Sequence, residues 1–299
     1  MTGPLLAAAT AQLAEAGVAS PGHDARALLA HAAGLDVSRL ALLDDVDDRQ
    51  RQAYAELIDE RARRVPLQHL TGRAGFRYLD LAVGPGVFVP RPETEQLVAW
   101  GLARIADAER PVVVDLCAGS GAVALAVAQE HPGAQVFAVE REELALAWAR
   151  RNATDRIAAG DAPVTVLRGD ALDPRLLAEL AGTVDLVLAN PPYVPVGSVV
   201  EREVAEHDPP AALWGGPDGL QVVRAVVQRA ATLLRRGSWC GIEHADLQGD
   251  AVPAVFARAG GWIEVSDHPD LVGRPRFTGG RWSGSASRTG DLHPWVPHE

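Results

Sequence analysis

The spacing of apolar residues predicts helices in the first part of the chain. In residues 47–64 the apolar positions recur every three or four residues, which places them on one face of a helix. These positions are Tyr54, Leu57, Ile58 and Ala62. An earlier helix is predicted to begin with Ser20 as N-cap and Pro21 in its first turn, and to stop at Gly34. We therefore expect residues 1–72 to form a small helical domain.

After residue 72 the pattern changes to alternation. Residues 76–83 alternate and are rich in strand formers, and a Gly-Pro-Gly sequence follows at 84–86. A turn sequence between two apolar segments predicts a β-hairpin, whose second strand would be residues 87–89. We interpret residues 73–90 as a hairpin linker. The next helix should start near Pro92 and run to about residue 105.

From residue 111 onward, short apolar segments alternate with helical ones. The predicted strands are residues 112–116, 135–139, 164–167, 184–189, 238–243 and 262–265. Helical segments lie between them, for example at 121–130 and 144–152. Short strands separated by helices are typical of a parallel sheet that is covered on both faces. We therefore expect residues 91–299 to form one α/β domain.

Composition narrows the class of protein. The chain has 299 residues, 47% of them hydrophobic, and carries a formal net charge of -11. This acidic balance argues against binding nucleic acid across a whole face, because it repels phosphate backbones. The two cysteines exclude a disulfide scaffold and a cysteine-rich zinc module. No apolar run approaches the roughly 18 residues of a membrane span, and no secretory signal is visible, so we expect a cytoplasmic protein.

A tight turn joins the first strand of the α/β part to a helix. Gly119 and Gly121 let the backbone approach a ligand closely, and the helix start offers free N–H groups. Glu140 is predicted to end the next strand, where a carboxylate can accept both hydroxyls of a ribose. Asp170 is predicted to end the third strand, where it can sit beside an adenine edge. Asp115 can orient the loop or meet the cationic methionyl end of S-adenosylmethionine.

The same turn leaves other interpretations open. Residues 119–124 also fit the G-x-G-x-x-A pattern of dinucleotide-binding proteins, and a plain α/β turn can carry the same glycines. The position of Asp115 favours S-adenosylmethionine over a nicotinamide cofactor. We interpret Cys117 as a small loop residue rather than a nucleophile, because no histidine lies near it in the sequence.

The strand 184–189 is followed by Asn190, Pro191, Pro192 and Tyr193, at the sheet edge where α/β proteins bind ligands. The two prolines fix φ and lack N–H donors, so the turn presents rigid acceptors: the Asn190 side-chain oxygen and the Pro191 carbonyl. Two acceptors can hold both N–H bonds of a planar NH2 group and aim its nitrogen at a sulfonium methyl. Tyr193 supplies a flat face for stacking. The turn thus predicts methylation of a planar amine.

Several segments resemble the protein-glutamine N5 methyltransferases that act on peptide chain release factors. Residues 89–95 are similar to the family signature I-P-R-P-[DE]-T-E, and residues 115–121 to its cofactor loop D-L-G-x-G-[ST]-G, with Cys117 replacing the first glycine. Residues 190–193 match its substrate motif. Further similar landmarks are 66–72 with Phe76 (His69 standing where Tyr is common), Glu140 in place of Asp, 208–220 with Asp208 in place of Glu, Glu243–His244, and 270–276.

The resemblance implies a Rossmann-like class I methyltransferase domain. Its seven-stranded, mostly parallel sheet would have an antiparallel edge, and the small N-terminal helical bundle would help to hold the substrate protein. S-adenosyl-L-methionine is implied as cofactor, without a metal. The implied substrate is the glutamine of the Gly-Gly-Gln loop of bacterial release factors, methylated on its side-chain nitrogen N5 by a monomeric enzyme.

Two sets of site residues follow from the turn chemistry and the resemblance together. The expected cofactor-binding residues are Asp115, Cys117, Ala118, Gly119, Ser120, Gly121, Glu140, Asp170, Ala171 and Asn190. The expected substrate-binding residues are Asn190, Pro191, Pro192 and Tyr193, of which Asn190, Pro191 and Tyr193 are the catalytic ones.

Other planar amines stay possible at this stage. A glutamine of a ribosomal protein is a close alternative, whereas an adenine or guanine amine of a nucleic acid fits the acidic charge less well. A nicotinamide oxidoreductase would have no use for the motif at 190–193. Three further residues are expected to be structural: Arg91, paired with Glu93 or Glu95, His244, and Arg276.

Overall fold

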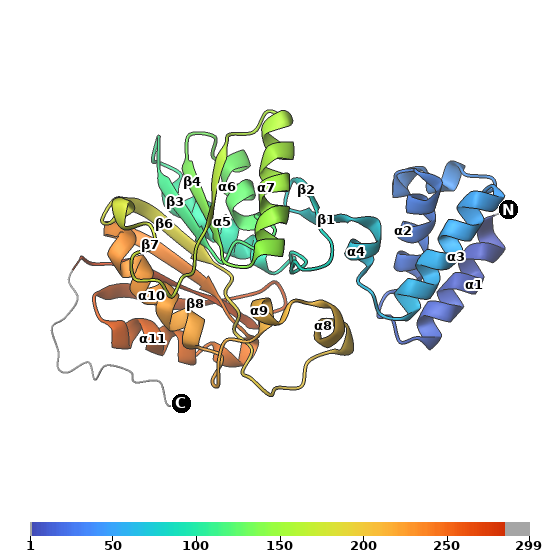
Figure 1. Cartoon of the computed structure of the whole chain (residues 1–299). Coiled ribbons are helices and arrows are strands. Elements are labelled where there is room, and N and C mark those ends of the chain that lie inside the picture. The colour runs from blue at the N-terminus through green and yellow to red at the C-terminus, as the bar shows by residue number, and fades with distance from the viewer. Residues whose placement is uncertain (1, 285–299) are drawn as a thin grey trace.

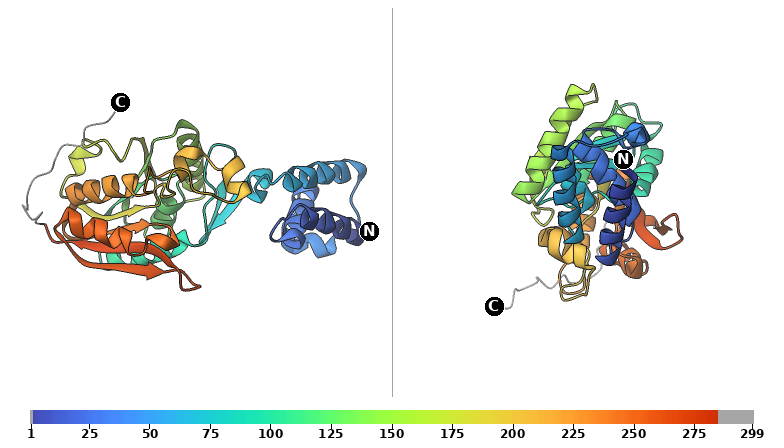
Figure 2. Two further views of the ribbon diagram at one scale, coloured as in Figure 1. Left: turned by 90° about the horizontal axis from the view of Figure 1, so that it is seen from below. Right: turned by 90° about the vertical axis from the view of Figure 1, so that its right-hand side faces the viewer.

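The computed structural model describes residues 2–284 of the chain. A group of helices at the N-terminal end is joined by a short hairpin to a larger α/β part (Figure 1). The views of Figure 2 show that these helices project from one side of the α/β part. The elements of this first group are α1 (Thr2–Glu15), α2 (Pro21–Ala33), a 3-10 helix (Val37–Leu42), α3 (Asp48–Ala62) and α4 (Leu67–Thr71).

The ends of these helices follow the local sequence at most points. α3 begins with a capping box, in which the Asp47 side chain accepts the Gln50 N–H and the Gln50 side chain accepts the Asp47 N–H. α2 ends at Gly34, which has the left-handed φ of 67° that suits glycine. Ser20 occupies the predicted N-cap position, with Pro21 in the first turn, but its φ and ψ of -128° and 61° are not extended and its side chain makes no capping hydrogen bond.

The hairpin lies earlier than predicted. It consists of β1 (Arg73–Phe76) and β2 (Leu79–Ala82), so Arg77 and Tyr78 form the turn, not residues 84–86. Arg77 keeps a φ of 51° because its N–H binds the Glu95 carboxylate and its guanidinium binds Glu130. These partners are distant in sequence, and local turn chemistry therefore gave the wrong turn. The predicted second strand, 87–89, is not a strand.

The α/β part contains a seven-stranded sheet of order β5-β4-β3-β6-β7-β9-β8, in which β9 runs antiparallel to both β7 and β8 and the other neighbouring pairs are parallel. The strands are β3 (Val112–Leu116), β4 (Gln135–Glu140), β5 (Val164–Arg168), β6 (Val184–Ala189), β7 (Leu234–Glu243), β8 (Trp262–Pro269) and β9 (Pro275–Trp282). The predicted strands are all present. Asp170 lies two residues beyond β5 instead of ending it.

Helices cover both faces of this sheet (Figure 1). One face carries α5 (Thr94–Ile105), α6 (Ala122–Glu130) and α7 (Glu143–Ala158), and the other carries α10 (Gln221–Leu233) and α11 (Ala251–Ala259). Two short helices, α8 (Arg202–His207) and α9 (Pro210–Leu213), lie in the connection from β6 to α10. Within residues 2–284 no helix combines the length and the apolar character that crossing a membrane requires.

Sequence patterns missed strand β9, whose glycines explain the omission. A Cβ at Gly279 would collide with the ring of Trp100 from α5, and one at Gly280 would lie 2.9 Å from Phe256 of α11. Both positions therefore need glycine so that aromatic rings can pack against the sheet from both faces. The lack of side chains removes the alternation by which strands are recognised.

Candidate active site

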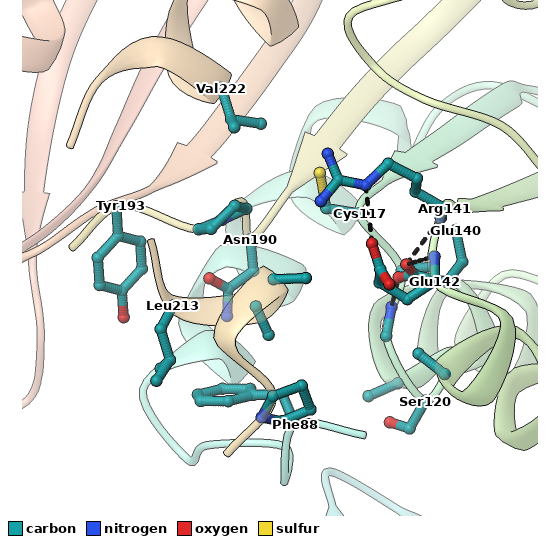
Figure 3. Close-up of a pocket in the computed structure, with 18 of the residues that line it drawn as sticks. Phe88, Cys117, Ser120, Glu140, Arg141, Glu142, Asn190, Tyr193, Leu213 and Val222 are labelled. Atoms are coloured by element: carbon teal, nitrogen blue, oxygen red, sulfur yellow. Dashed lines mark hydrogen bonds and ion pairs between the residues drawn. The ribbon is translucent and has the colours of Figure 1, made fainter. Parts of the chain in front are cut away.

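A cavity of about 500 Å³ opens at the carboxyl ends of β3, β4, β5 and β6. Ligands of open α/β sheets bind at this edge. Figure 3 shows its two sides. Cys117, Ser120, Glu140 and Arg141 lie on one side, and Asn190, Tyr193, Phe88 and Leu213 lie on the other.

The first side is built from the loop between β3 and α6. Gly119 donates its N–H to Glu140 Oε2 at 2.8 Å, and the N–H groups of Arg141 and Glu142 donate to Glu140 Oε1. The Glu140 carboxylate, at the end of β4, therefore holds the loop between β3 and α6 in place. Its burial raises the pKa of Glu140, although the three N–H donors oppose that shift.

The loop has an unusual backbone conformation. Gly119 and Gly121 have φ values of 57° and 86°, and Cys117 has a φ of 67°, which is rare for a residue with a side chain. Burial raises the pKa of the Cys117 thiol far above its usual range. A protonated thiol is a poor nucleophile, so this shift is consistent with the interpretation of Cys117 as a loop residue.

Most of the expected cofactor residues line the cavity, and two do not. Those that do are Cys117, Ala118, Gly119, Ser120, Glu140, Asp170, Ala171 and Asn190. Gly121 instead packs beneath the loop, where a Cβ would lie 3.2 Å from Leu125. Asp115 is buried behind the loop, and its Oδ2 accepts the Ala124 N–H at 3.1 Å. The sequence analysis gave Asp115 two possible roles, to orient the loop or to contact the methionyl group of the cofactor. The burial of Asp115 and its hydrogen bond to Ala124 fit the first role and not the second.

The arrangement fits S-adenosylmethionine. A Cβ at Gly119 would meet nothing within 4 Å, so the loop leaves open space next to the Glu140 carboxylate. Glu140 can accept ribose hydroxyls there, and Asp170 lies at the lining of the same cavity beyond β5. No group of three or more His, Cys, Asp or Glu side chains that could hold a metal is found among residues 2–284.

The turn after β6 forms the second side. Asn190 donates from Nδ2 to Thr94 Oγ1 at 3.2 Å, and Asn190, Pro192 and Tyr193 line the cavity. Pro191 is buried and does not line it, so its predicted acceptor role is not visible here. Gln248 donates to the Tyr193 carbonyl at 3.0 Å and helps to hold the turn from below.

The segment from Asp208 to Leu220 braces this turn. Val194 donates its N–H to the Leu213 carbonyl at 2.8 Å, and Gly215 returns an N–H to the Val194 carbonyl at 2.9 Å. A Cβ at Gly215 would lie 2.5 Å from the Pro192 carbonyl oxygen, and one at Gly219 would collide with the Tyr193 carbonyl. The glycines of this motif therefore serve close packing against the turn.

Arg91 has a different partner from the one predicted. It pairs with Asp208 at 3.0 Å, not with Glu93 or Glu95, and lies over the Phe88 ring at 4.9 Å. This ion pair joins the segment before α5 to the segment from Asp208 to Leu220. The two segments are distant in sequence. Desolvation raises the pKa of Asp208, and Arg91 opposes that shift.

Sequence reasoning missed several residues here as functional candidates: Thr94, Phe88 and Leu213 line the cavity, and Glu243 lies near Thr94. Glu243 at the end of β7 is 1% exposed and lies near the hydroxyls of Thr94 and Tyr193. Burial raises the pKa of Glu243 to about 7, while the nearby Arg276 opposes that shift. A carboxylate at the end of an otherwise apolar strand was the available signal.

The neighbouring His244 is structural, as expected. It is fully buried, donates from Nδ1 to the Ala245 carbonyl at 2.9 Å, and has Nε2 at 3.0 Å from Thr278 Oγ1. Arg276 pairs with Asp270 at 3.3 Å and also lines the cavity.

Comparisons with known proteins agree with this geometry. Residues 4–72 match the family model of the PrmC N-terminal domain, and residues 97–207 match that of the methyltransferase small domain. The crystal structure of the hMettl16 catalytic domain with a 3'UTR hairpin is similar in fold, with a TM-score of 0.52 at 15% identity, over 70% of this chain and 77% of that one.

Two curated relatives differ in substrate. A release factor glutamine methyltransferase of Mycolicibacterium smegmatis is 50% identical over 270 residues, which cover 90% of this chain and 94% of that protein. A 4-amino-L-phenylalanine/4-methylamino-L-phenylalanine methyltransferase of Streptomyces pristinaespiralis is 39% identical over 271 residues, covering 87% of this chain and 89% of that protein. The chain is an S-adenosylmethionine-dependent methyltransferase and belongs to the release factor glutamine methyltransferase family.

Proposed function

We propose that this enzyme methylates the side-chain nitrogen N5 of the glutamine in the Gly-Gly-Gln segment of bacterial peptide chain release factors. The name of the 50% identical relative supports a release-factor glutamine as substrate. The observation that carries the proposal is the held side chain of Asn190. Its Nδ2 is bound to Thr94, and its Oδ1 accepts no hydrogen bond from the described residues, which leaves this oxygen for a substrate N–H.

The chemistry requires an aimed nitrogen more than a base. A carboxamide nitrogen is a poor nucleophile because its lone pair is delocalised, and S-adenosylmethionine supplies the electrophilic methyl group. Asn190 Oδ1 can accept one substrate N–H, and the predicted second acceptor is the Pro191 carbonyl. Such orientation is worth roughly 7–11 kcal/mol of a reaction barrier. The acceptors bind more strongly as positive charge develops on the nitrogen.

Apolar side chains surround this position. Tyr193, Phe88 and Leu213 line the same side of the cavity as Asn190 (Figure 3). A planar carboxamide can stack on such rings, and their exclusion of water strengthens the hydrogen bonds to the amide. We assign Tyr193 to stacking because burial raises its pKa far above the usual range and keeps the hydroxyl protonated.

We also propose a separate role for each part of the chain. Residues 1–72 would hold the release factor, residues 73–90 would link the two parts, and residues 91–299 would bind cofactor and glutamine. The match of residues 4–72 to a family model of their own supports this division.

The test is mass spectrometry of a purified bacterial release factor after incubation with the enzyme and S-adenosylmethionine. We expect a gain of one methyl group that maps to the glutamine of the Gly-Gly-Gln segment. Asn190→Ala should remove turnover while calorimetry shows little change in S-adenosylhomocysteine affinity. A release factor that gains no methyl group, with cofactor binding demonstrated, would end the proposal.

A second candidate substrate is a free arylamine. The relative named for 4-amino-L-phenylalanine is 39% identical, and an aromatic NH2 is also planar and conjugated. Leu213 and Val222 give the cavity apolar walls that an aromatic ring could contact. Incubation with 4-amino-L-phenylalanine in place of the release factor separates the two: methylation of the amino acid alone would favour this second candidate.

A further inference from the structure

The helical part of the chain, residues 2–72, has an apolar core of its own. Leu28, Tyr54 and Ile58 are among its buried side chains, and Leu67 and Leu70 of α4 pack against them. Among residues 2–284, this core shares no side chain with the clusters that fill the hairpin and the α/β part. Two parts without a common apolar interface are expected to move relative to each other unless other contacts hold them.

The polar contacts between the two parts converge on one carboxylate. Within the described residues, the ion pairs and side-chain hydrogen bonds that join residues 2–72 to residues beyond 90 all end on Glu203 of α8. Arg61 Nη1 donates to Glu203 Oε2 at 2.8 Å, and Arg64 Nη2 lies 3.4 Å from the same oxygen. Figure 1 shows α8 on the side of the α/β part that faces the helical part.

The helical part holds both arginines in place. Arg61 has a side chain that is 7% exposed, and it donates from Nε to Asp24 Oδ2 at 2.8 Å and from Nη1 to the Val65 carbonyl at 2.9 Å. Arg64 donates to the Gly17 carbonyl, and its φ of 72° is rare for a residue with a side chain. The two cations are therefore fixed by α1–α3 and their connections, and the carboxylate from α8 is their partner from the α/β part.

The contact lies beside the cavity. Glu201 and Val204, on either side of Glu203 in the sequence, line the cavity wall. Asp208, directly after α8, pairs with Arg91, which also lines the cavity. The helical part is thus attached to the same short segment that forms this wall.

We propose that Glu203 is a positioning residue, which fixes the helical part relative to the cavity by holding Arg61 and Arg64. This inference rests on the proposed function, in which residues 1–72 hold the release factor. A substrate protein bound there presents its glutamine to Asn190 efficiently only when the two parts keep one orientation. Loss of the Glu203 carboxylate leaves one cation without an opposing charge, and movement of the helical part away from α8 returns that cation to water.

The first test measures the orientation itself and needs no substrate. Backbone residual dipolar couplings of the full chain, taken from α1–α3 and from β3–β7, report how each part is aligned and show that each is folded. We expect one alignment tensor to fit both parts in the wild type and two different tensors in Glu203→Ala.

Glu206→Ala is the matched control for this measurement. Glu206 lies on the same helix, and its carboxylate pairs with Arg202 and His207 of that helix. Its removal should leave the common tensor unchanged. A common tensor in Glu203→Ala, or separate tensors in the wild type or in Glu206→Ala, would overturn the assignment.

Methylation kinetics test the consequence for the reaction. In Glu203→Ala we expect kcat for the release factor to fall by about 10- to 100-fold, in the range for a displaced reacting group. Its KM and the affinity for S-adenosylhomocysteine should stay close to the wild-type values, because both binding surfaces remain. Glu203→Gln keeps a neutral acceptor for Arg61 and should recover part of kcat, and Glu206→Ala should keep all of it.

The two measurements separate this inference from the proposed function. A wild-type kcat in Glu203→Ala, or an equal loss in Glu206→Ala, contradicts the positioning role. A release factor that the wild-type enzyme does not methylate refutes only the proposed substrate, because the dipolar couplings still decide whether Glu203 fixes the helical part.

Discussion

The substitution Gly119→Ala tests whether the cofactor packs against the loop after β3. Gly119 has a φ of 57°, and the added Cβ would meet no protein atom within 4 Å. An alanine with this positive φ destabilises the folded state by about 1–2 kcal/mol. Alanine also lowers the conformational entropy of the unfolded chain, which stabilises the protein by about 0.4–1 kcal/mol. We therefore expect the free energy of unfolding to fall by only about 1 kcal/mol. The protein should fold, with a methyl group projecting into the cavity.

The same methyl group should weaken cofactor binding. It would stand beside the N–H that Gly119 donates to Glu140 at 2.8 Å, on the side where the ligand is expected. Overpacking a filled site costs roughly 1–3 kcal/mol. At 1.4 kcal/mol per factor of ten, this corresponds to about 5- to 150-fold weaker binding of S-adenosylhomocysteine in a calorimetric titration.

Gly34→Ala is the matched control. Gly34 has a φ of 67°, its added Cβ also meets nothing within 4 Å, and it lies at the end of α2, far from the cavity in the chain's helical part. Urea unfolding should show a similar loss of stability for both variants, while Gly34→Ala binds the cofactor like wild type. Wild-type affinity in Gly119→Ala would refute the placement of the cofactor against this loop.

Urea unfolding tests three further features, one ion pair in the N-terminal helices and two residues at or before the loop after β3. Arg61→Met leaves the 7% exposed Asp24 carboxylate without its partner at 2.8 Å, which should lower the free energy of unfolding by about 3–5 kcal/mol. The double variant Arg61→Met with Asp24→Leu should recover most of this loss. Equal stability of the single and the double variant would contradict the prediction. The pKa of Asp115 is raised to about 8 by burial, so the folded state keeps its proton while the unfolded state loses it near pH 4, and stability declines as pH rises through this window. Asp115→Asn should remove a decline of up to about 1.4 kcal/mol per pH unit, and an unchanged slope would argue against a buried proton. Cys117 has a φ of 67°, so Cys117→Gly should be tolerated. The β-branched Cys117→Val should lower the free energy of unfolding by more than 1 kcal/mol, within the roughly 1–3 kcal/mol that a strained residue costs. A Cys117→Val variant as stable as the wild type would show that the loop is not constrained.

The sequence predicted the parts of the fold whose signals are local. Six of the seven strands of the large sheet and the helix from Asp48 to Ala62 follow apolar periodicity and capping residues that lie next to one another in the chain. The hairpin turn at Arg77 could not be predicted in this way, because its backbone conformation depends on Glu95 and Glu130. Strand β9 was missed because its glycines exist to admit rings from two helices.

The same distinction separates the two sides of the cavity. The cofactor side is made mostly by one turn, Cys117 to Gly121, together with Glu140 at the next strand end, and a parallel sheet brings consecutive strand ends together whatever the side chains are. Sequence position alone was therefore enough to place both Gly119 and Glu140 at this edge of the sheet.

The substrate side depends on contacts that no local pattern contains. Thr94, Asn190 and Glu243 come from α5, the end of β6 and the end of β7, and they meet because β6 and β7 are neighbours in the sheet and α5 packs across both. The proline turn could be identified from the sequence, but the direction of the Asn190 amide could not, since a threonine hydroxyl can either donate or accept. In the structure the Thr94 oxygen accepts the Nδ2–H of Asn190 at 3.2 Å. The contact with α5 therefore determines the chemistry of the acceptor as well as its position.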